Sequence, residues 1–193
     1  MERIFIYGAG GQGKVVIDAL EAGPGAFEVA FIVDDDMKLH GETRRGHPIT
    51  SPEVIRAERG IVAIGDNLIR MSIASRYHGR LITVVHPRAW IAPGVELGEG
   101  TVVLAAAIVG SDAKIGQNVI VNTSATIDHD SVIGNGVHIA PGCHLCGNVH
   151  VGAGTLLGVG TVVRPGVKIG RNVFVHAGNR LSKDIPDGEI VRA

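Results

Sequence analysis

Residues 109–133 read VGSDAKIGQNVIVNTSATIDHDSVI, and every sixth residue of this stretch is valine or isoleucine. The same phase runs from Val85 to Leu181 without a shift, and all seventeen positions in it are Ile, Leu or Val. In a β-sandwich, turns recur about every 8–12 residues and no single phase persists. A short strand with one buried aliphatic residue, followed by a corner and repeated in one phase, is instead typical of a β-solenoid.

The glycine content fits a solenoid. The chain has 28 glycines, 45% hydrophobic residues and only 4% aromatic residues. A thin core of branched aliphatic side chains has little room for rings, and glycine suits corners that need a positive φ or a close approach of backbones. Glycine follows the aliphatic position in seven hexads, at Gly98, Gly110, Gly116, Gly134, Gly152, Gly158 and Gly170.

Composition also narrows the classes of partner and location. The net charge of −1 gives no electrostatic basis for wrapping nucleic acid. The sequence has no run of 18 apolar residues and no signal-peptide pattern at its start, so we expect no membrane partner. Its two cysteines are too few for a disulfide-stabilised secreted scaffold. These observations predict a cytoplasmic protein.

The first part of the chain has a different pattern, in which strand-like and helix-like segments alternate. This alternation predicts a small parallel α/β domain over residues 1–82, followed by the solenoid over residues 83–193. Ser51 and Pro52 suit the N-cap and the first position of a helix. Strands are expected at 3–7, 29–33 and 61–64, and helices at 14–22, 51–59 and 67–77.

A glycine-rich loop connects the first expected strand to the first helix. Its pattern Gly8-x-Gly10-x-x-Gly13, with acidic residues about 24 positions later, fits the dinucleotide-binding fingerprint. Backbone N–H groups at the start of the helix would hold a phosphate. Because about 80 residues hold only half of a dinucleotide-binding fold, we favour a nucleoside-diphosphate group over NAD. A tight turn without a ligand is the alternative.

Three segments carry a more specific signal: YGAGGQGKVV at 7–16, IGDN at 64–67 with Arg70, and NTSATIDHDSVIG at 122–134. Together they resemble bacterial nucleotide-sugar acyltransferases of the PglD, perosamine N-acetyltransferase and NeuD type, and the resemblance covers nearly the whole chain. It implies a triangular left-handed parallel β-helix with three hexads per coil. It also implies that the α/β domain binds a UDP- or GDP-sugar and that acetyl-CoA is the co-substrate.

The same resemblance implies roles for individual residues. His129 would be the general base, and Asp130 would be the acid that makes it more basic. The family has a common histidine where this chain has Gln12, and this chain ends at Val191-Arg192-Ala193 without the family's usual Gly-x-Pro-Ala-Lys/Arg tail. The acyl donor would contact His138, Gly147, Val159 and Ala177, and the nucleotide-sugar would contact Gly10, Gly11, Gln12, Asp34 and Asp35.

The residues around His129 also point to chemistry without the resemblance. Asn122 and Asp128 replace the usual glycine or alanine after the aliphatic position, so Asn122 is a candidate substrate contact. Histidine suits proton removal near neutral pH, and a carboxylate would fix its tautomer. Asp128, His129 and Asp130 are expected on one short strand, where neighbours point to opposite faces. Asp130 could then orient His129 only at a corner or through another subunit, and Asp128 is a competing partner. A solvated edge is the alternative.

The spacing of two histidines bears on assembly. His138 lies nine residues after His129, which is half of a coil of three hexads. In one chain the two side chains should therefore lie on opposite sides of the prism, and a site that uses both needs two chains. This spacing predicts a homotrimer with active sites between subunits.

The charge distribution of the later hexads is one-sided. No acidic residue occurs between Asp130 and Asp184, which favours an anionic ligand such as the phosphates of CoA, although a solvated basic surface is the alternative. The basic residues in this stretch are Arg164, Lys168, Arg171, Arg180 and Lys183.

The remaining histidines and cysteines give little support to a metal site. His138, His144 and His150 are spaced by the repeat period, and Cys143 and Cys146 have no second cysteine pair. We therefore expect no metal and two free thiols.

These patterns predict an acetyl-CoA-dependent N-acetyltransferase that acts on a nucleotide-linked amino sugar in glycan biosynthesis. An O-acetyltransferase acting on sialic acid or a related sugar is the nearest alternative. A γ-carbonic-anhydrase-like metalloenzyme and a non-catalytic nucleotide-sugar-binding scaffold are alternatives of other classes. The sequence leaves the choice between UDP and GDP open.

Overall fold

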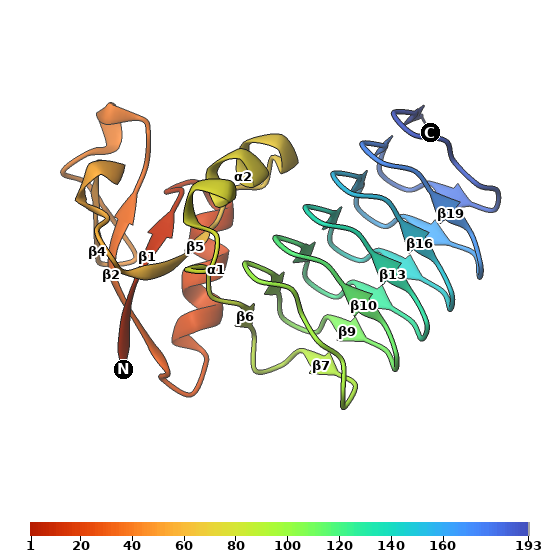
Figure 1. Ribbon diagram of the computed structural model, residues 1–193, viewed down its shortest axis with the longest axis horizontal. Coiled ribbons are helices and arrows are strands. Elements are labelled where there is room, and N and C mark those ends of the chain that lie inside the picture. The colour runs from red at the N-terminus through yellow and green to blue at the C-terminus, as the bar shows by residue number, and fades with distance from the viewer. Residues whose placement is uncertain (193) are drawn as a thin grey trace.

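The computed structural model describes residues 1–192 and consists of two parts (Figure 1). An α/β unit forms one end of the molecule, and a prism of stacked coils leads away from it to the C-terminus. No helix among residues 1–192 is both long enough and apolar enough to cross a membrane.

The α/β unit has a five-stranded sheet in the order β3-β4-β2-β1-β5. The central β1 pairs in parallel with β2 and β5, as the alternating pattern predicts, and only β3 runs antiparallel to its neighbour. The strands are β1 (Glu2–Tyr7), β2 (Phe27–Val33), β3 (Thr43–Arg44), β4 (His47–Thr50) and β5 (Arg59–Val62). The helices are α1 (Gly11–Glu21) and α2 (Asn67–Ala74), with 3₁₀ turns at Met37–Leu39, Pro52–Val54 and Ser75–Tyr77.

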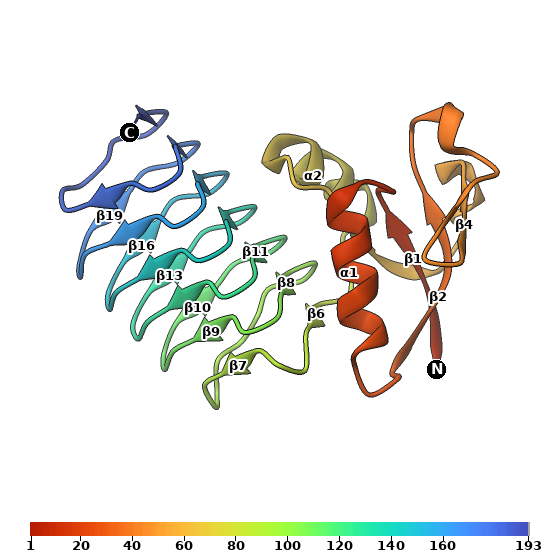
Figure 2. The same cartoon turned by 180° about the vertical axis from the view of Figure 1, so that it is seen from behind.

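Both faces of this sheet are covered. The last four residues of β1 are fully buried, as expected for a central parallel strand between two layers. α1 packs on one face through Val16 and Ile17, in an apolar cluster that continues into Val102 and Leu104 of the prism. Figure 2 shows α1 between the sheet and the first coils. α2 packs on the other face, through Ile73.

The helix expected at 51–59 is wrong beyond its first turn. Ser51 does cap the N–H of Glu53 with its hydroxyl, and Pro52 occupies the first position, but only the 3₁₀ turn Pro52–Val54 forms. Ile55 already has an extended backbone, with ψ of 120°. The chain joins β1 as β5 from Arg59 onward, so too few residues remain for an α-helix and strand pairing overrides the local signal.

The prism has three faces, each a ladder of two-residue parallel strands. The β14 face contains β6 (Val84–Val85), β8 (Val102–Val103), β11 (Ile120–Val121), β14 (His138–Ile139), β17 (Leu156–Leu157), β20 (Phe174–Val175) and β22 (Ile190–Val191). The β12 face contains β7 (Trp90–Ile91), β9 (Ile108–Val109), β12 (Thr126–Ile127), β15 (His144–Leu145), β18 (Val162–Val163) and β21 (Arg180–Leu181). The β13 face contains β10 (Lys114–Ile115), β13 (Val132–Ile133), β16 (His150–Val151) and β19 (Lys168–Ile169).

The register confirms the six-residue phase. Thr126 pairs with His144 and Ile127 with Leu145, so each coil contains eighteen residues, or three hexads. The second residue of each strand is the hexad aliphatic, and from Val103 to Leu181 these side chains form one continuous core. The first position, Val85, is 39% exposed because β6 is the last strand of its ladder.

Two corner positions explain the glycines, for different reasons. From Gly94 to Gly178 the third residue after each aliphatic has a positive φ, and Asp112, Asp130 and Asn148 adopt it as well as glycine does. The glycine directly after the aliphatic does not have a positive φ. A Cβ at Gly110 would lie 2.8 Å from the backbone nitrogen of His129 in the next coil. Close stacking of coils is therefore what requires these hexad glycines.

Arg70 of α2 fastens the α/β unit to the prism. Its side chain is 1% exposed, and its Nε and one Nη donate to the carbonyls of Asn118 (3.0 Å) and Gly136 (2.8 Å), which occupy one corner in successive coils. Its other Nη donates to the carbonyls of Ile64 (3.0 Å) and Gly65 (3.1 Å) in the loop before α2. Burial lowers the pKa of Arg70 to about 10, which leaves the guanidinium charged at neutral pH.

Candidate active site

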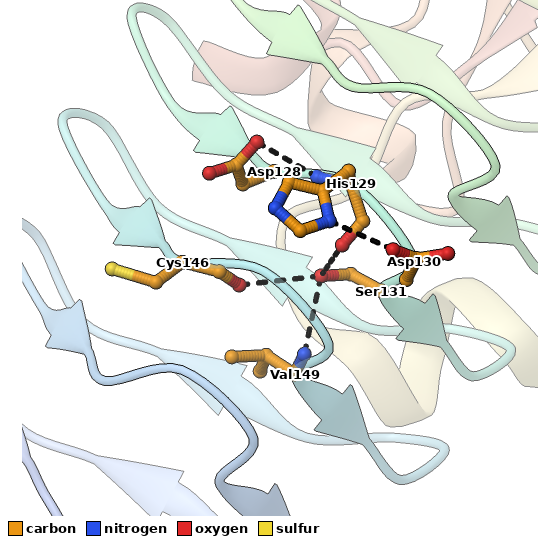
Figure 3. Close-up of polar contacts among 6 residues, drawn as sticks. All are labelled: Asp128, His129, Asp130, Ser131, Cys146 and Val149. Atoms are coloured by element: carbon orange, nitrogen blue, oxygen red, sulfur yellow. Dashed lines mark hydrogen bonds and ion pairs between the residues drawn. The ribbon is translucent and has the colours of Figure 1, made fainter.

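His129 lies at the corner between β12 and β13. The sequence-based placement of Asp128, His129 and Asp130 on one strand is wrong, because the strand ends at Ile127 and the three residues form the turn. Asp130 takes the positive-φ position, with φ of 59°, which folds its side chain back toward its neighbour. Its Oδ2 lies 2.7 Å from Nδ1 of His129 (Figure 3). Adjacent residues can meet here because the backbone turns between them.

The two carboxylates beside His129 have different partners. Asp130 contacts the ring, whereas Oδ1 of Asp128 accepts the backbone N–H of His129 at 2.8 Å. The hydrogen bond to Asp130 raises the pKa of His129, and the charge of Asp128 adds to this effect. A carboxylate only accepts, so Nδ1 carries the proton and Nε2 presents its lone pair. This is the tautomer of a general base oriented by an acid.

We expect Asp130→Asn to shift the acidic limb of the pH profile of kcat/KM to lower pH. The carboxylate stabilises the imidazolium, so its removal lowers the pKa of His129, and the ring then stays unprotonated at lower pH. The plateau rate should fall, because the amide no longer stabilises the proton that the ring accepts. The profile of both proteins across the titration range of histidine tests this. Asp112→Asn, at the same corner position one coil earlier, should leave the limb in place; an unmoved limb in Asp130→Asn would contradict the pairing.

The imidazole of His129 packs against Gly147 of the next coil. A Cβ at Gly147 would lie 2.6 Å from Cε1 and 2.7 Å from Nε2 of His129, so only glycine lets the ring lie over this corner. The buried hydroxyl of Ser131 accepts the N–H of Val149 (3.2 Å) and donates to the carbonyl of Cys146 (3.4 Å), which ties the two coils together behind the ring (Figure 3). The position of His129 is thus set by packing as well as by Asp130.

A groove of about 480 Å³ runs along the β12 face beside His129. Its wall includes a column of outward-facing residues, in which the Thr126 hydroxyl lies 2.9 Å from Nδ1 of His144. No sequence pattern described above singles out this column. Its members are spaced by one coil, so adding eighteen repeatedly to residue 90 would have found them: Trp90, Ile108, Thr126 and His144.

A second cavity, of about 330 Å³, lies at the carboxyl ends of β1 and β2. The glycine-rich loop and the acidic residues after β2 meet there, as the fingerprint predicts. The five residues expected to contact a nucleotide-sugar all line this cavity: Gly10, Gly11, Gln12, Asp34 and Asp35.

The two acidic residues of this cavity differ in how many of their carboxylate oxygens are engaged by hydrogen bonds. Both oxygens of Asp34 accept backbone N–H groups, from Ala9 (2.8 Å) and Asp36 (2.9 Å), so Asp34 holds the glycine loop in place. Among the described residues, Asp35 accepts a side-chain hydrogen bond only from the Tyr7 hydroxyl, at 2.8 Å. Burial raises the pKa of Tyr7, which keeps that hydroxyl a donor. Nε2 of Gln12 is buried without a partner among the described residues. Asp35 and Gln12 therefore keep capacity for a ligand.

His138 and Asn122 lie on the side of the prism that faces the α/β unit. Nδ1 of His138 is 3.2 Å from the carbonyl of Gly65, and its Nε2 is 3.1 Å from the Asn122 amide nitrogen. Burial, together with the charge of Arg70, lowers the pKa of His138 to about 4, so the ring is neutral at physiological pH. His129 and His138 thus occupy different sides of one prism, as their spacing predicts.

The remaining predicted acyl-donor contacts are divided between two edges. Gly147 lies directly beneath His129. Val159 and Ala177 are exposed and lie at the corner between the β14 and β12 faces, one coil apart, so a single chain does not bring them to His129. Within residues 1–192, no group of three or more His, Cys, Asp or Glu side chains is placed to hold a metal ion, and both cysteines are free thiols.

Family models match both parts of the chain. The PglD N-terminal domain matches residues 3–77, the bacterial transferase hexapeptide matches 130–164 and 148–183, and the hexapeptide repeat of succinyl-transferase matches 106–141. A UDP-N-acetylbacillosamine N-acetyltransferase of Bacillus subtilis is 35% identical over 114 residues, which are 54% of this chain and 52% of that protein. The chain thus spans about half the length of this curated relative.

Solved structures match over almost the full length. The acetyltransferase domain of PglB from Neisseria gonorrhoeae is 34% identical, with a TM-score of 0.90 over 98% of this chain and 96% of that one. PerB from Caulobacter crescentus, in complex with CoA and GDP-perosamine, is 36% identical, with a TM-score of 0.90 over 98% and 93%. The prism is thus the left-handed β-helix of a hexapeptide-repeat acyltransferase. The chain belongs to the sugar N-acetyltransferases that join a PglD-type N-terminal domain to such a helix.

Proposed function

We propose that this protein transfers the acetyl group of acetyl-CoA to the amine of a nucleotide-linked sugar, in glycan biosynthesis, with His129 as general base. The observation that carries the proposal is the His129–Asp130 pair, which leaves Nε2 unprotonated beside a groove of about 480 Å³. The relatives support the substrate class, because PerB was solved with CoA and GDP-perosamine and the PglB domain with acetyl coenzyme A.

In the proposed reaction, the amine nitrogen attacks the thioester carbonyl while Nε2 of His129 accepts a proton from it. The carbon–nitrogen bond forms, the carbon–sulfur bond breaks, and the thiolate of CoA leaves with the proton that His129 carried. Asp130 stabilises the imidazolium while it exists. No covalent acyl-enzyme is required, because both substrates meet at one base.

Three of the five basic residues of the later hexads indicate the path that a bound CoA would follow along the prism. Arg164 and Lys183 lie on the same edge as His129, two and three coils further on, and Arg180 lies on the adjoining β12 face. At about 4.8 Å per coil, Arg164 and Lys183 lie roughly 10 and 14 Å from the His129 level. We propose that CoA extends along this edge, with its thioester near His129 and Gly147 and its phosphates near these cations. Contacts to His138, Val159 and Ala177 would come from another subunit.

A homotrimer accounts for the separation of the two cavities. The cavity of about 330 Å³ beside the glycine-rich loop, called the nucleotide-type cavity from here on, reaches the prism at Gly65. Gly65 contacts His138 on the β14 face, whereas His129 occupies the corner opposite that face. One chain therefore cannot present a sugar held in its own cavity to its own base. We propose that the cavity of one subunit faces His129 of the next. A solution mass equal to one chain at working concentration would contradict this arrangement. The cytoplasmic location stays a prediction.

Two measurements test the activity. UDP- and GDP-linked amino sugars should raise the melting temperature by binding the folded state, and the nucleotide that does so identifies the substrate class. Those that bind should then release free CoA thiol from acetyl-CoA. Binding without thiol release would favour a non-catalytic scaffold, and release with hydroxyl sugars alone would favour an O-acetyltransferase.

A further inference from the structure

The carboxylate of Asp128 has capacity that the His129–Asp130 pair does not use. One oxygen accepts the backbone N–H of His129. Among residues 1–192, no other hydrogen bond or ion pair engages this side chain, and the ion pair at this corner joins only His129 and Asp130. The second oxygen of Asp128 therefore accepts no hydrogen bond from residues 1–192, and no lysine or arginine among them pairs with the carboxylate.

The Asp128 carboxylate borders the groove where a substrate would react. Asp128 is exposed and lines the groove together with His129 and Cys146. In Figure 3, Asp130 meets the imidazole at Nδ1, and the Asp128 carboxylate is drawn on the opposite side of the ring. The equivalent position in the preceding coil is Gly110, which has no side chain to cover the carboxylate. A group that approaches Nε2 of His129 thus passes beside Asp128.

We propose that Asp128 binds the ammonium group of the acceptor sugar and so selects amines over hydroxyls. This inference rests on the proposed acetyl transfer and adds a determinant of which atom is acetylated. A sugar amine in its ammonium form has three N–H donors, so it can donate to Asp128 and to Nε2 of His129 at the same time. A hydroxyl has one hydrogen and no charge, so it can satisfy only one of the two acceptors.

The proton balance of this step is complete. The ammonium nitrogen loses two protons as it becomes an amide. One goes to solvent before the attack and frees the lone pair of the nitrogen, and the other passes through His129 to the sulfur of CoA, which leaves as a thiol. The carbon–nitrogen bond replaces the carbon–sulfur bond, and Asp128 is unchanged at the end. Charge-assisted hydrogen bonds are about twice as strong as neutral ones, so the ammonium should gain most from this contact.

Asp128→Asn is the variant that separates charge from structure. The carboxamide oxygen can still accept the N–H of His129, so the turn keeps its hydrogen bond, but the negative charge is removed. We expect kcat/KM for the nucleotide-amino sugar to fall roughly 10- to 100-fold, the size expected for a hydrogen bond to a charged group. The analogue with a hydroxyl in place of the amine, measured as a competitive inhibitor, should bind as it does to the wild type.

Two further variants complete this experiment. Asp112→Asn, on the same edge one coil earlier, should change neither measurement. Asp128→Ser keeps a short oxygen acceptor for the N–H of His129 and serves if the asparagine variant does not fold. Equal losses for the amine and the hydroxyl analogue would overturn the proposal in favour of a role in the turn alone, as would unchanged kinetics with the amine. Failure of the wild type to acetylate any nucleotide-amino sugar would overturn the proposed function, and this inference with it.

Discussion

His129→Ala should lower kcat for acetyl transfer roughly 10²–10⁴-fold, the range that general base catalysis supplies. Nε2 of the ring presents its lone pair because Nδ1 carries the proton and donates it in a hydrogen bond to Asp130, and alanine removes the Nε2 acceptor. Substrate binding should change much less, since the cavity of the α/β unit lies elsewhere and Arg164 and Lys183 lie two and three coils further along the edge. Steady-state kinetics with acetyl-CoA and a nucleotide-amino sugar would measure both parameters.

Folding should not confound this result. The His129 side chain is exposed at a corner, so its removal leaves no buried cavity and the melting temperature should stay near that of the wild type. His150→Ala provides a matched control, because His150 faces outward on the β13 face and has no carboxylate partner among the described residues. Activity of His129→Ala close to that of the wild type would refute the role of general base.

Arg70→Met should reduce the free energy of unfolding by about 2–4 kcal/mol, since each buried polar group left unpaired costs about 1–3 kcal/mol. Methionine fills a similar volume but donates no hydrogen bonds. The carbonyls of Asn118 and Gly136 in the prism, and those of Ile64 and Gly65 before α2, would each lose a donor. Removing Arg70 also removes a buried charge, and the desolvation energy regained in this way offsets part of the cost.

The measurement is denaturant unfolding, with nucleotide-sugar affinity as a second readout. Gly65 lines the nucleotide-type cavity, so its loss of support should weaken binding as well. Arg76→Met is the matched control: this arginine follows α2, is exposed, and stacks over Tyr7 at 5.8 Å without contacting the prism. Its stability change should stay within about 1 kcal/mol. Equal stability of the two variants would contradict the fastening role of Arg70.

The failures of sequence reasoning share a cause. Ser51 and Pro52 signal a helix start correctly, but the helix does not continue because residues 59–62 pair with β1, more than fifty positions earlier. The hexad glycines are identifiable by their period, yet their purpose depends on the backbone of the next coil, eighteen residues away. A local sequence pattern carries no information about contacts between residues so far apart in the chain.

The amino-acid sequence is sufficient to predict the prism, the α/β unit and the polar exception at His129. In a solenoid each coil contacts only its neighbours, so a pattern that repeats every six residues specifies nearly all of the core, and a polar exception to it is visible at once. Only the three-dimensional fold shows which carboxylate pairs with the imidazole of His129. That pairing depends on the positive φ of Asp130, which sets a direction in space. The fold likewise brings His138 to the carbonyl of Gly65, a contact across 73 residues that no periodicity encodes.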